Sequence, residues 1–355
     1  MQGWFHTEIP DQVSDAIYKS SQKKQFTYGS ETSELEDLFK KRLSVKFAIY
    51  TNSGTSALAM ALLAIGVKEG DEVIVPAIGW IATAQAILLT GAKPVVVDTV
   101  NNHTNIDIKN LKNSLNEKTK AIIPVNYNGR QVNIQELKDN IPPDVQIIED
   151  SCKSMFSKSF NKINFSGTNG ICGCFSLGMI SMLPSCYGGL VVTNDKSIYE
   201  KLKIIKYHGV TYNPEIYKYN SFNFKTSNLF ASMACEMFKS IDQRIDKLNK
   251  IYIYYEKKLQ NSNFKIIPVN IDDGEIPLLI DIYSEDKLAS KVMKILKDRN
   301  VSTLGYHPPL SSADYLPKFD TPNANWLTER TFHLPCGPDQ DFKNINNAIE
   351  VLLKM

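Results

Sequence analysis

The stretch KFAIYTNSGTSALAMALLAIG, from Lys46 to Gly66, decides the fold class. Its first half is a short apolar run typical of a buried strand, and its second half has the alanine and leucine content of a helix. The same alternation recurs: strands are predicted at 71–77, 93–98, 119–127 and 145–151, and helices at 80–91, 111–118 and 134–140. Strands rich in valine and isoleucine that alternate with helices predict a mostly parallel sheet covered on both faces.

The pattern changes after Asp195. A helix closed by Gly209 is predicted at 197–209, and a polar loop rich in tyrosine and asparagine at 210–225. Residues 227–260 contain neither glycine nor proline and predict one long helix that leads to a second domain. That domain has strand candidates at 276–283 and 301–307 and helix candidates at 286–300 and 342–355. The chain therefore divides into a large α/β domain, 1–240, and a smaller C-terminal α+β domain, 241–355.

Composition excludes several classes of protein. The chain has 355 residues, 43% of them hydrophobic, which is enough for a sizeable core. Its 40 basic and 38 acidic side chains give a net charge of +2, so no nucleic-acid partner is expected. The start lacks a signal-peptide pattern and no apolar run reaches membrane-spanning length, which predicts a cytoplasmic protein without a membrane partner. The six cysteines include no CxxC, and Cys172 and Cys174 are expected to be strand residues, with no metal site.

Three motifs lie where predicted strands end. In TNSGTSAL, Thr51 to Leu58, a strand turns into a helix whose free N–H groups favour an anion, so the turn is either a phosphate site or an ordinary N-cap. Asp150 ends a buried strand, at the edge of the sheet where ligands bind. Its carboxylate would either pair with a cation, because an unpaired buried charge is costly, or cap a neighbouring helix. Trp80 follows a strand and begins a helix, and it either stacks on a planar ligand or belongs to the core.

The order of these motifs, followed by the Gly-Gly turn at 188–189, resembles the DegT/StrS family. These are fold-type-I enzymes, mostly pyridoxal-phosphate-dependent aminotransferases that act on nucleotide-linked keto sugars. The resemblance covers nearly the whole chain, through segments at 26–58, 70–98, 123–130, 147–154, 222–233, 305–310 and 332–339. The resemblance implies a fold-type-I architecture with a mostly parallel central sheet.

The resemblance also implies a role for each motif residue. Trp80 would stack on the pyridine ring, and Asp150 would pair with the ring nitrogen and so stabilise the electron sink. The cofactor, pyridoxal or pyridoxamine 5′-phosphate, would be bound through its phosphate by Gly54, Thr55, Ser56 and Ser176. Asn223 would reach the phosphate of a partner subunit, which implies a two-fold homodimer. The substrate would be a nucleotide-linked keto sugar, with glutamate as the amino donor.

One position departs from the family. Where the pattern has the Schiff-base lysine, this chain has Ser181, and a serine hydroxyl cannot bind the cofactor covalently in the same way. The neighbours have changed too: Pro184 and the turn Ser185-Cys186-Tyr187-Gly188-Gly189 differ from the usual sequence. Several changes together favour natural divergence over a deliberate replacement of the lysine.

Lys153 is a second departure, since the family commonly has glutamine or histidine there. Its amine would either approach the cofactor aldehyde or, without a covalent bond, remain solvated in a loop or hold the ring oxygen. The non-covalent alternatives are preferred because a relocated covalent bond requires new geometry. Without the lysine, Ser181, Lys153 and His208 are the candidate catalytic residues, with Lys153 or His208 moving the proton.

Several functions stay open at this point. The first is an altered cofactor-dependent enzyme of the sugar aminotransferase family, in glycan or natural-product biosynthesis. Family members with histidine at the lysine position are pyridoxamine-dependent sugar dehydratases, so a dehydratase-like enzyme is an alternative. A catalytically silent sugar-nucleotide-binding subunit is another. A redox enzyme fits poorly, because no GxGxxG follows a predicted strand.

Overall fold

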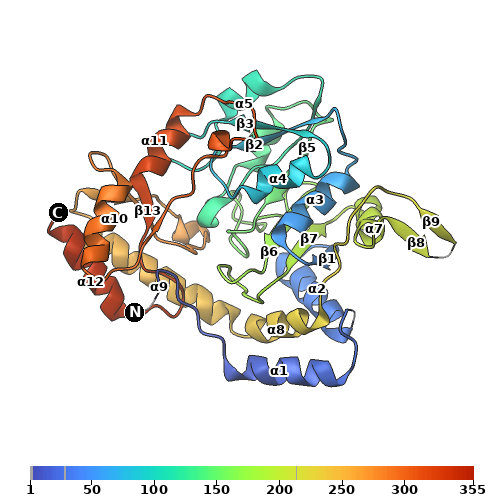
Figure 1. Ribbon diagram of the computed structural model, residues 1–355, viewed down its shortest axis with the longest axis horizontal. Helices are drawn as coiled ribbons and strands as arrows, with labels where there is room; N and C mark the ends of the chain where they lie inside the picture. The colour runs from blue at the N-terminus through green and yellow to red at the C-terminus, as the bar shows by residue number, and fades with distance from the viewer. Residues whose placement is uncertain (1–2, 28, 213) are drawn as a thin grey trace.

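A seven-stranded sheet organises the first part of the chain (Figure 1). The computed structural model describes residues 3–27, 29–212 and 214–355. The strands, in the order β1-β7-β6-β5-β4-β2-β3, are β1 Phe47–Thr51, β7 Gly189–Thr193, β6 Cys172–Ser176, β5 Gln146–Asp150, β4 Thr119–Ile122, β2 Glu72–Pro76 and β3 Lys93–Val97. From β6 to β3 every pairing is parallel, whereas β7 pairs antiparallel with both β6 and β1. The predicted, mostly parallel α/β sheet is therefore confirmed.

Helices cover both faces of this sheet because successive strand residues point to opposite sides. Val73 and Val75 pack with α3 Gly54–Ala64, α4 Ala82–Leu88 and α7 Lys196–Ile205. Ile74 points the other way and packs with α5 Ile108–Ser114 and α6 Ile134–Lys138. At the β1 end, the second face is covered by α2 Ser30–Leu43 and α8 Asn228–Phe238, with α1 Asp11–Gln22 against α8.

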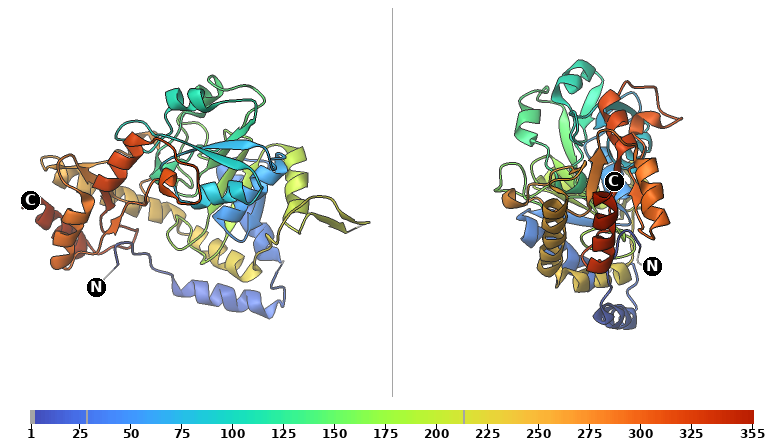
Figure 2. Two further views of the ribbon diagram at one scale, coloured as in Figure 1. Left: turned by 45° about the horizontal axis from the view of Figure 1, so that its top comes forward. Right: turned by 90° about the vertical axis from the view of Figure 1, so that its left-hand side faces the viewer.

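A smaller antiparallel sheet forms near the C-terminus. Its strands, in the order β10-β11-β13-β12, are β10 Phe264–Ile266, β11 Asp281–Ser284, β13 Thr331–His333 and β12 Leu304–Gly305. The helices of this part are α9 Ile241–Leu259, α10 Ala289–Asp298, α11 Pro322–Arg330 and α12 Phe342–Leu353. Both chain ends lie on this side of the molecule, and Phe5 forms a parallel β-bridge with Cys336 (Figure 2). The N-terminal segment is thus tied to the small sheet.

The single long helix predicted for 227–260 is wrong. The segment forms α8 and α9, with a break at Lys239 and Ser240. The N–H groups of Lys239 and Ser240 bond to carbonyls three residues back, at Glu236 and Met237, which tightens the last turn. Ser240 then leaves the helical region, with φ −103° and ψ 11°. A helix can therefore end without glycine or proline. The division into domains 1–240 and 241–355 stays a prediction, although its boundary falls at this break.

The polar segment 210–225 is more ordered than a loop. It contains a hairpin, β8 Val210–Tyr212 and β9 Glu215–Tyr217, that projects from the body of the molecule (Figure 1). Tyr212 and Tyr217 expose most of their surface, and Ile216 is half exposed. The preceding helix α7 ends at Ile205, and Gly209 closes the following turn with φ +72°. None of the helices in the described residues is long and apolar enough to cross a membrane.

Candidate active site

A cavity of about 430 Å³ lies between the large sheet and the small one. From the large-sheet side its lining includes Ser53, Gly54, Thr55, Trp80, Thr83, Asp150, Lys153 and Ser176. From the small-sheet side it includes Leu279, Leu304, His307 and His333, and the N-terminal segment adds Trp4. The carboxyl ends of β5 and β6 and the start of α3 meet here, at the edge where parallel sheets bind ligands.

The start of α3 forms one wall. Ser53 is extended and caps the helix, and its Oγ accepts a hydrogen bond from the N–H of Ser56 at 3.1 Å. Gly54 lets the helix approach the ends of β5 and β6, because a Cβ there would lie 2.9 Å from both Cys152 Sγ and Ser176 Cβ. The first-turn N–H groups and the Thr55 hydroxyl therefore lie close to Ser176, where they can bind an anion.

Gly54→Ala is expected to disturb this wall. The added methyl group overlaps two neighbours, and such overpacking costs about 1–3 kcal/mol of the free energy of unfolding. Urea unfolding followed by circular dichroism measures the loss. Gly3→Ala is the matched control, because its Cβ would have no neighbour closer than 3.7 Å. Equal stability of the two variants would contradict the close packing of α3.

Asp150 ends β5 with its side chain 5% exposed. Its Oδ2 accepts a hydrogen bond from the Thr83 hydroxyl at 2.7 Å, and its Oδ1 accepts from the N–H of Cys152 at 3.1 Å. Thr83 comes from α4 and is fully buried. Two donors thus fix a carboxylate at the cavity wall, where it can pair with a cationic ring nitrogen.

Trp80 presents its ring to the cavity from the segment between β2 and α4. It is 53% exposed, so it is not a core residue. Its ring meets His307 edge-on, with centroids 4.4 Å apart and an interplanar angle of 67°. Burial, together with the charges of His333 and Lys153, lowers the pKa of His307 to about 4, so this imidazole is neutral at pH 7. Trp80 therefore offers a flat aromatic face beside a neutral ring.

Lys153 also lines the cavity, three residues beyond Asp150. Its Nζ donates a hydrogen bond to the carbonyl of Ile180, immediately before Ser181. Burial lowers the pKa of Lys153 to about 8, although Cys152 and Asp150 act in the opposite direction. The amine is half-buried and is deprotonated far more readily than a surface lysine.

Ser181 is buried and is not among the cavity-lining residues. Its Oγ has no hydrogen-bond partner among the described residues. The neighbouring residues Gly178, Met179 and Ile180 form the cavity edge instead. Met182 lies in the core and Tyr187 is exposed, so neither of them fills the cavity.

The remaining predicted residues lie elsewhere in the chain. Ser56 and Asn223 line a neighbouring hollow together with Tyr187, and Ser53 borders both spaces. His208 is exposed in the turn after α7, with φ +59°, and is not part of the cavity lining. One chain thus brings together Gly54, Thr55, Trp80, Asp150, Lys153 and Ser176, but not Ser181, Ser56, Asn223 or His208.

Among the lining residues that sequence reasoning missed are Trp4, Thr83, His307 and His333. The two histidines offered a signal, because the chain has only five and these lie in the short segments GYHPPL and FHLP. Trp4 and Thr83 gave no such signal. They reach the cavity through contacts with His333 and Asp150 that are distant in sequence.

Relatives and solved structures resemble this chain over much of its length. An uncharacterized protein from Methanocaldococcus jannaschii is 29% identical over 98% of this chain and 97% of its own length. A GDP-perosamine synthase from Escherichia coli O157:H7 is 29% identical over 66% of this chain and 64% of its own. A GDP-4-keto-6-deoxy-D-mannose 3-dehydratase from E. coli O55:H7 is 35% identical over 56% of this chain and 54% of its own length. The alignments to these two enzymes thus span less than two thirds of each enzyme.

The similar structures confirm the fold-type-I architecture. One is a mutant GDP-4-keto-6-deoxymannose-3-dehydratase with bound GDP-perosamine, with a TM-score of 0.88 and 25% identity over 99% of this chain and 100% of that one. Another is the E. coli dehydratase with bound hydrated PLP, with a TM-score of 0.90 and 25% identity over 99% of both chains. Members of the family bind pyridoxal or pyridoxamine phosphate. The model of the DegT/DnrJ/EryC1/StrS aminotransferase family matches residues 8–353, and the chain belongs to this family.

Proposed function

We propose that this protein is a vitamin B6-dependent enzyme that acts on a nucleotide-linked keto sugar and binds its cofactor without a covalent bond to residue 181. The observation that carries the proposal is the convergence of Thr55, Trp80 and Asp150 on one cavity, with the amine of Lys153 beside the backbone of Ile180. The proposal places Ser181 at the position of the family's lysine.

The residues of the cavity fit such a cofactor. Thr55, Ser176 and the start of α3 supply donors for a phosphate, and Gly54 provides the close approach that this requires. Trp80 provides a face for the pyridine ring, and Asp150 with its two donors provides the anion for the ring nitrogen. When bound, the cofactor supplies an electron sink that makes carbon–hydrogen bonds beside it acidic.

Lys153 is proposed as the group that moves the proton at the cofactor. Its Nζ accepts a proton as the neutral amine and returns it as the ammonium ion, and its pKa of about 8 allows both states near neutral pH. The carbonyl of Ile180 orients the amine. Ser181 is given no proton-transfer role, because its hydroxyl is buried away from the lining, and His208 is given none within the same chain.

The substrate is proposed to be a GDP-linked 4-keto-6-deoxy sugar. Support comes from the relatives that share this chemistry in their names, GDP-perosamine synthase and GDP-4-keto-6-deoxy-D-mannose 3-dehydratase. The lost lysine favours the dehydratase-like reaction, with the cofactor in its pyridoxamine form. Glutamate remains the proposed donor that restores this form.

A homodimer located in the cytoplasm is also proposed. Asn223 is exposed beside the hollow that adjoins Ser53, where a second copy could present its phosphate site. The hairpin β8–β9 exposes Tyr212, Ile216 and Tyr217 to a partner. Light scattering of the purified protein tests the dimer, and Asn223→Ala is expected to weaken cofactor binding. A monodisperse monomer that binds cofactor fully would contradict this arrangement.

The central experiment separates three possibilities: an enzyme that binds its cofactor without a covalent bond, an enzyme with a covalent bond at Lys153, and a silent sugar-nucleotide-binding subunit. The purified protein is titrated with pyridoxal and pyridoxamine phosphate, followed by absorbance, then reduced with borohydride and digested for peptide mapping. We expect saturable binding of both forms with no labelled lysine, and conversion of GDP-4-keto-6-deoxymannose by the pyridoxamine form. Label on Lys153 would show a relocated covalent bond instead. Absence of binding, with no thermal stabilisation, would favour the silent sugar-nucleotide-binding subunit.

A further inference from the structure

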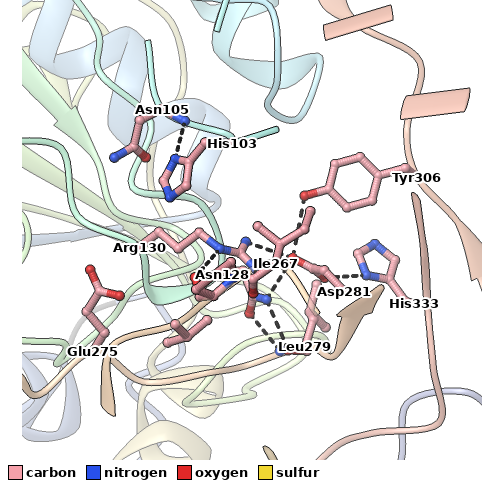
Figure 3. Close-up of polar contacts among 12 residues, drawn as sticks. His103, Asn105, Asn128, Arg130, Ile267, Glu275, Leu279, Asp281, Tyr306 and His333 are labelled. Atoms are coloured by element: carbon pink, nitrogen blue, oxygen red, sulfur yellow. Dashed lines mark hydrogen bonds and ion pairs between the residues drawn. The ribbon is translucent and has the colours of Figure 1, made fainter. Parts of the chain in front are cut away.

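A buried carboxylate–imidazole pair lies on the small-sheet side of the cavity (Figure 3). Asp281 in β11 and His333 in β13 are direct partners in the antiparallel register. His333 Nδ1 lies 2.7 Å from Asp281 Oδ1, and both side chains are fully buried. The register of the two strands thus fixes a short hydrogen bond that the proposed cofactor chemistry does not yet use.

Asp281 is held as an anion by its other oxygen. Oδ2 accepts hydrogen bonds from Arg130 Nη1 at 2.7 Å, from Asn128 Nδ2 at 2.9 Å and from the Tyr306 hydroxyl at 3.5 Å. Burial alone raises the pKa of Asp281, but Arg130 and His333 outweigh it and hold this pKa well below its usual range. Asp281 is therefore held as a carboxylate that accepts the hydrogen bond from His333.

This contact determines which nitrogen of His333 is available. Because Asp281 accepts at Nδ1, the neutral ring carries its proton on Nδ1 and leaves a lone pair on Nε2. Nε2 is buried and has no hydrogen-bond partner among the described residues, while the side chain lines the cavity. A buried polar atom without a partner costs about 1–3 kcal/mol, so this nitrogen is placed to meet a ligand.

The ring cannot turn away from the cavity without losing its packing. Trp4 stacks on His333 with centroids 5.5 Å apart and an interplanar angle of 22°, and the ring of Tyr306 lies 5.1 Å away. A purely structural histidine would place both nitrogens on protein partners. Here one nitrogen is fixed by a carboxylate, and the other has no partner among the described residues although the side chain lines the cavity.

We propose that His333 is an acid–base catalytic residue of the cavity and that Asp281 is its positioning residue. Nε2 takes up a proton from solvent, and the imidazolium donates it to a hydroxyl of the bound sugar as the C–O bond breaks, so that water leaves with the bonding electrons and the neutral ring is restored. The imidazolium formed in between is stabilised by the Asp281 carboxylate. This inference rests on the proposed function: it gives the sugar an acid–base group in a chain without the family's lysine.

Several titratable groups lie close to His333. Asp281 of β11 bonds to its Nδ1, the ring of Tyr306 after β12 lies 5.1 Å away, and Lys153 and His307 line the same cavity. The Asp281 carboxylate, held as an anion, is the group in direct contact with the imidazole.

The first test is nitrogen-15 NMR of the full-length protein with labelled histidines. His333→Gln identifies the resonances of His333 among the five histidines. We expect the cofactor-free protein to show a proton on Nδ1, and addition of GDP-mannose to shift the Nε2 resonance. A proton on Nε2, or no shift on saturation with GDP-mannose, would overturn the inference whether or not the protein binds a B6 cofactor.

The second test compares variants of the cofactor-loaded protein. His333→Gln is expected to lower turnover about 10²–10⁴-fold and to remove one limb of the pH–rate profile, with cofactor affinity unchanged. This variant keeps the Arg130–Asp281 ion pair, and circular dichroism checks that it folds. His6→Gln is the control, because its ring lies outside the cavity lining, 3.9 Å from Glu8. Full turnover by His333→Gln, with an unchanged pH profile, would overturn the role of His333 while leaving the proposed function intact.

Discussion

Lys153→Met is expected to lower turnover of the keto-sugar substrate by about 10²–10⁴-fold while leaving the cofactor bound. The amine of Lys153 lines the cavity and donates to the Ile180 carbonyl, next to Ser181, where we propose that the family's lysine is replaced. Removing the amine removes the proposed proton carrier, but it leaves Trp80 and Asp150 to hold the ring. Steady-state kinetics and absorbance titration measure the two effects separately.

The pH dependence sharpens this prediction. Burial lowers the pKa of Lys153 to about 8, so the fraction of neutral amine, and with it the rate, should rise as pH increases through about 8. The unfolded chain keeps this proton to higher pH, so the free energy of unfolding should also rise with pH above about 8. Lys153→Met should lose both trends.

Two variants serve as controls for Lys153. Lys153→Arg retains the charge but not the neutral state, so it should be as inactive as the methionine variant. Lys158→Met removes a lysine outside the cavity lining, whose Nζ lies 3.9 Å from the ring centre of Phe165, and should retain full turnover. Activity of Lys153→Arg near that of the unmodified protein would show that charge, not proton transfer, is what residue 153 provides.

Arg130→Met is expected to reduce the free energy of unfolding by about 3–5 kcal/mol. Arg130 is 1% exposed, and its Nη1 pairs with the fully buried Asp281 at 2.7 Å. Its Nε and Nη2 donate to the carbonyls of Pro268 at 2.9 Å and Ile267 at 2.8 Å. The substitution leaves an uncompensated carboxylate and two carbonyls without donors in the interior.

Urea unfolding measures this loss, and a double variant identifies its cause. In Arg130→Met/Asp281→Asn the buried charge is removed, so part of the stability should return relative to Arg130→Met. Arg299→Met is the control, because the side chain of Arg299 is exposed at the end of α10 and its loss should change stability by less than about 0.5 kcal/mol. Equal stability of the single and double variants would show that lost packing, not the unpaired anion, dominates.

Local sequence predicted the parts of the fold that depend on local physics. The alternation of apolar strands and helices placed β1, α3, β2 and β5 correctly, because each is specified by its own pattern of burial. The break between α8 and α9 was not predictable from glycine or proline, since tightened i−3 bonds end α8 there. The hairpin β8–β9 was missed because its exposed strands carry no alternating apolar face.

Some residues of the candidate site could likewise be predicted from local sequence, and others could not. Asp150, Trp80 and Thr55 could be predicted because each follows a strand of the large sheet, and such strand ends meet at one edge. Asp281 and His333 could not, because their contact depends on antiparallel pairing between strands 52 residues apart. For Ser181 the sequence indicated a candidate site residue but not where its side chain lies. Only the fold shows that its hydroxyl is buried away from the cavity lining.

The junction of the two chain ends has a practical consequence for synthesis and engineering. Trp4 stacks on His333 and Phe5 bridges Cys336, so one wall of the cavity is completed only by residues separated by almost the entire sequence. A ribosome must therefore translate beyond Cys336 before this wall can assemble. A bulky affinity tag immediately before Trp4 would lie near a wall of the cavity, so tag-free protein is the appropriate material for affinity measurements.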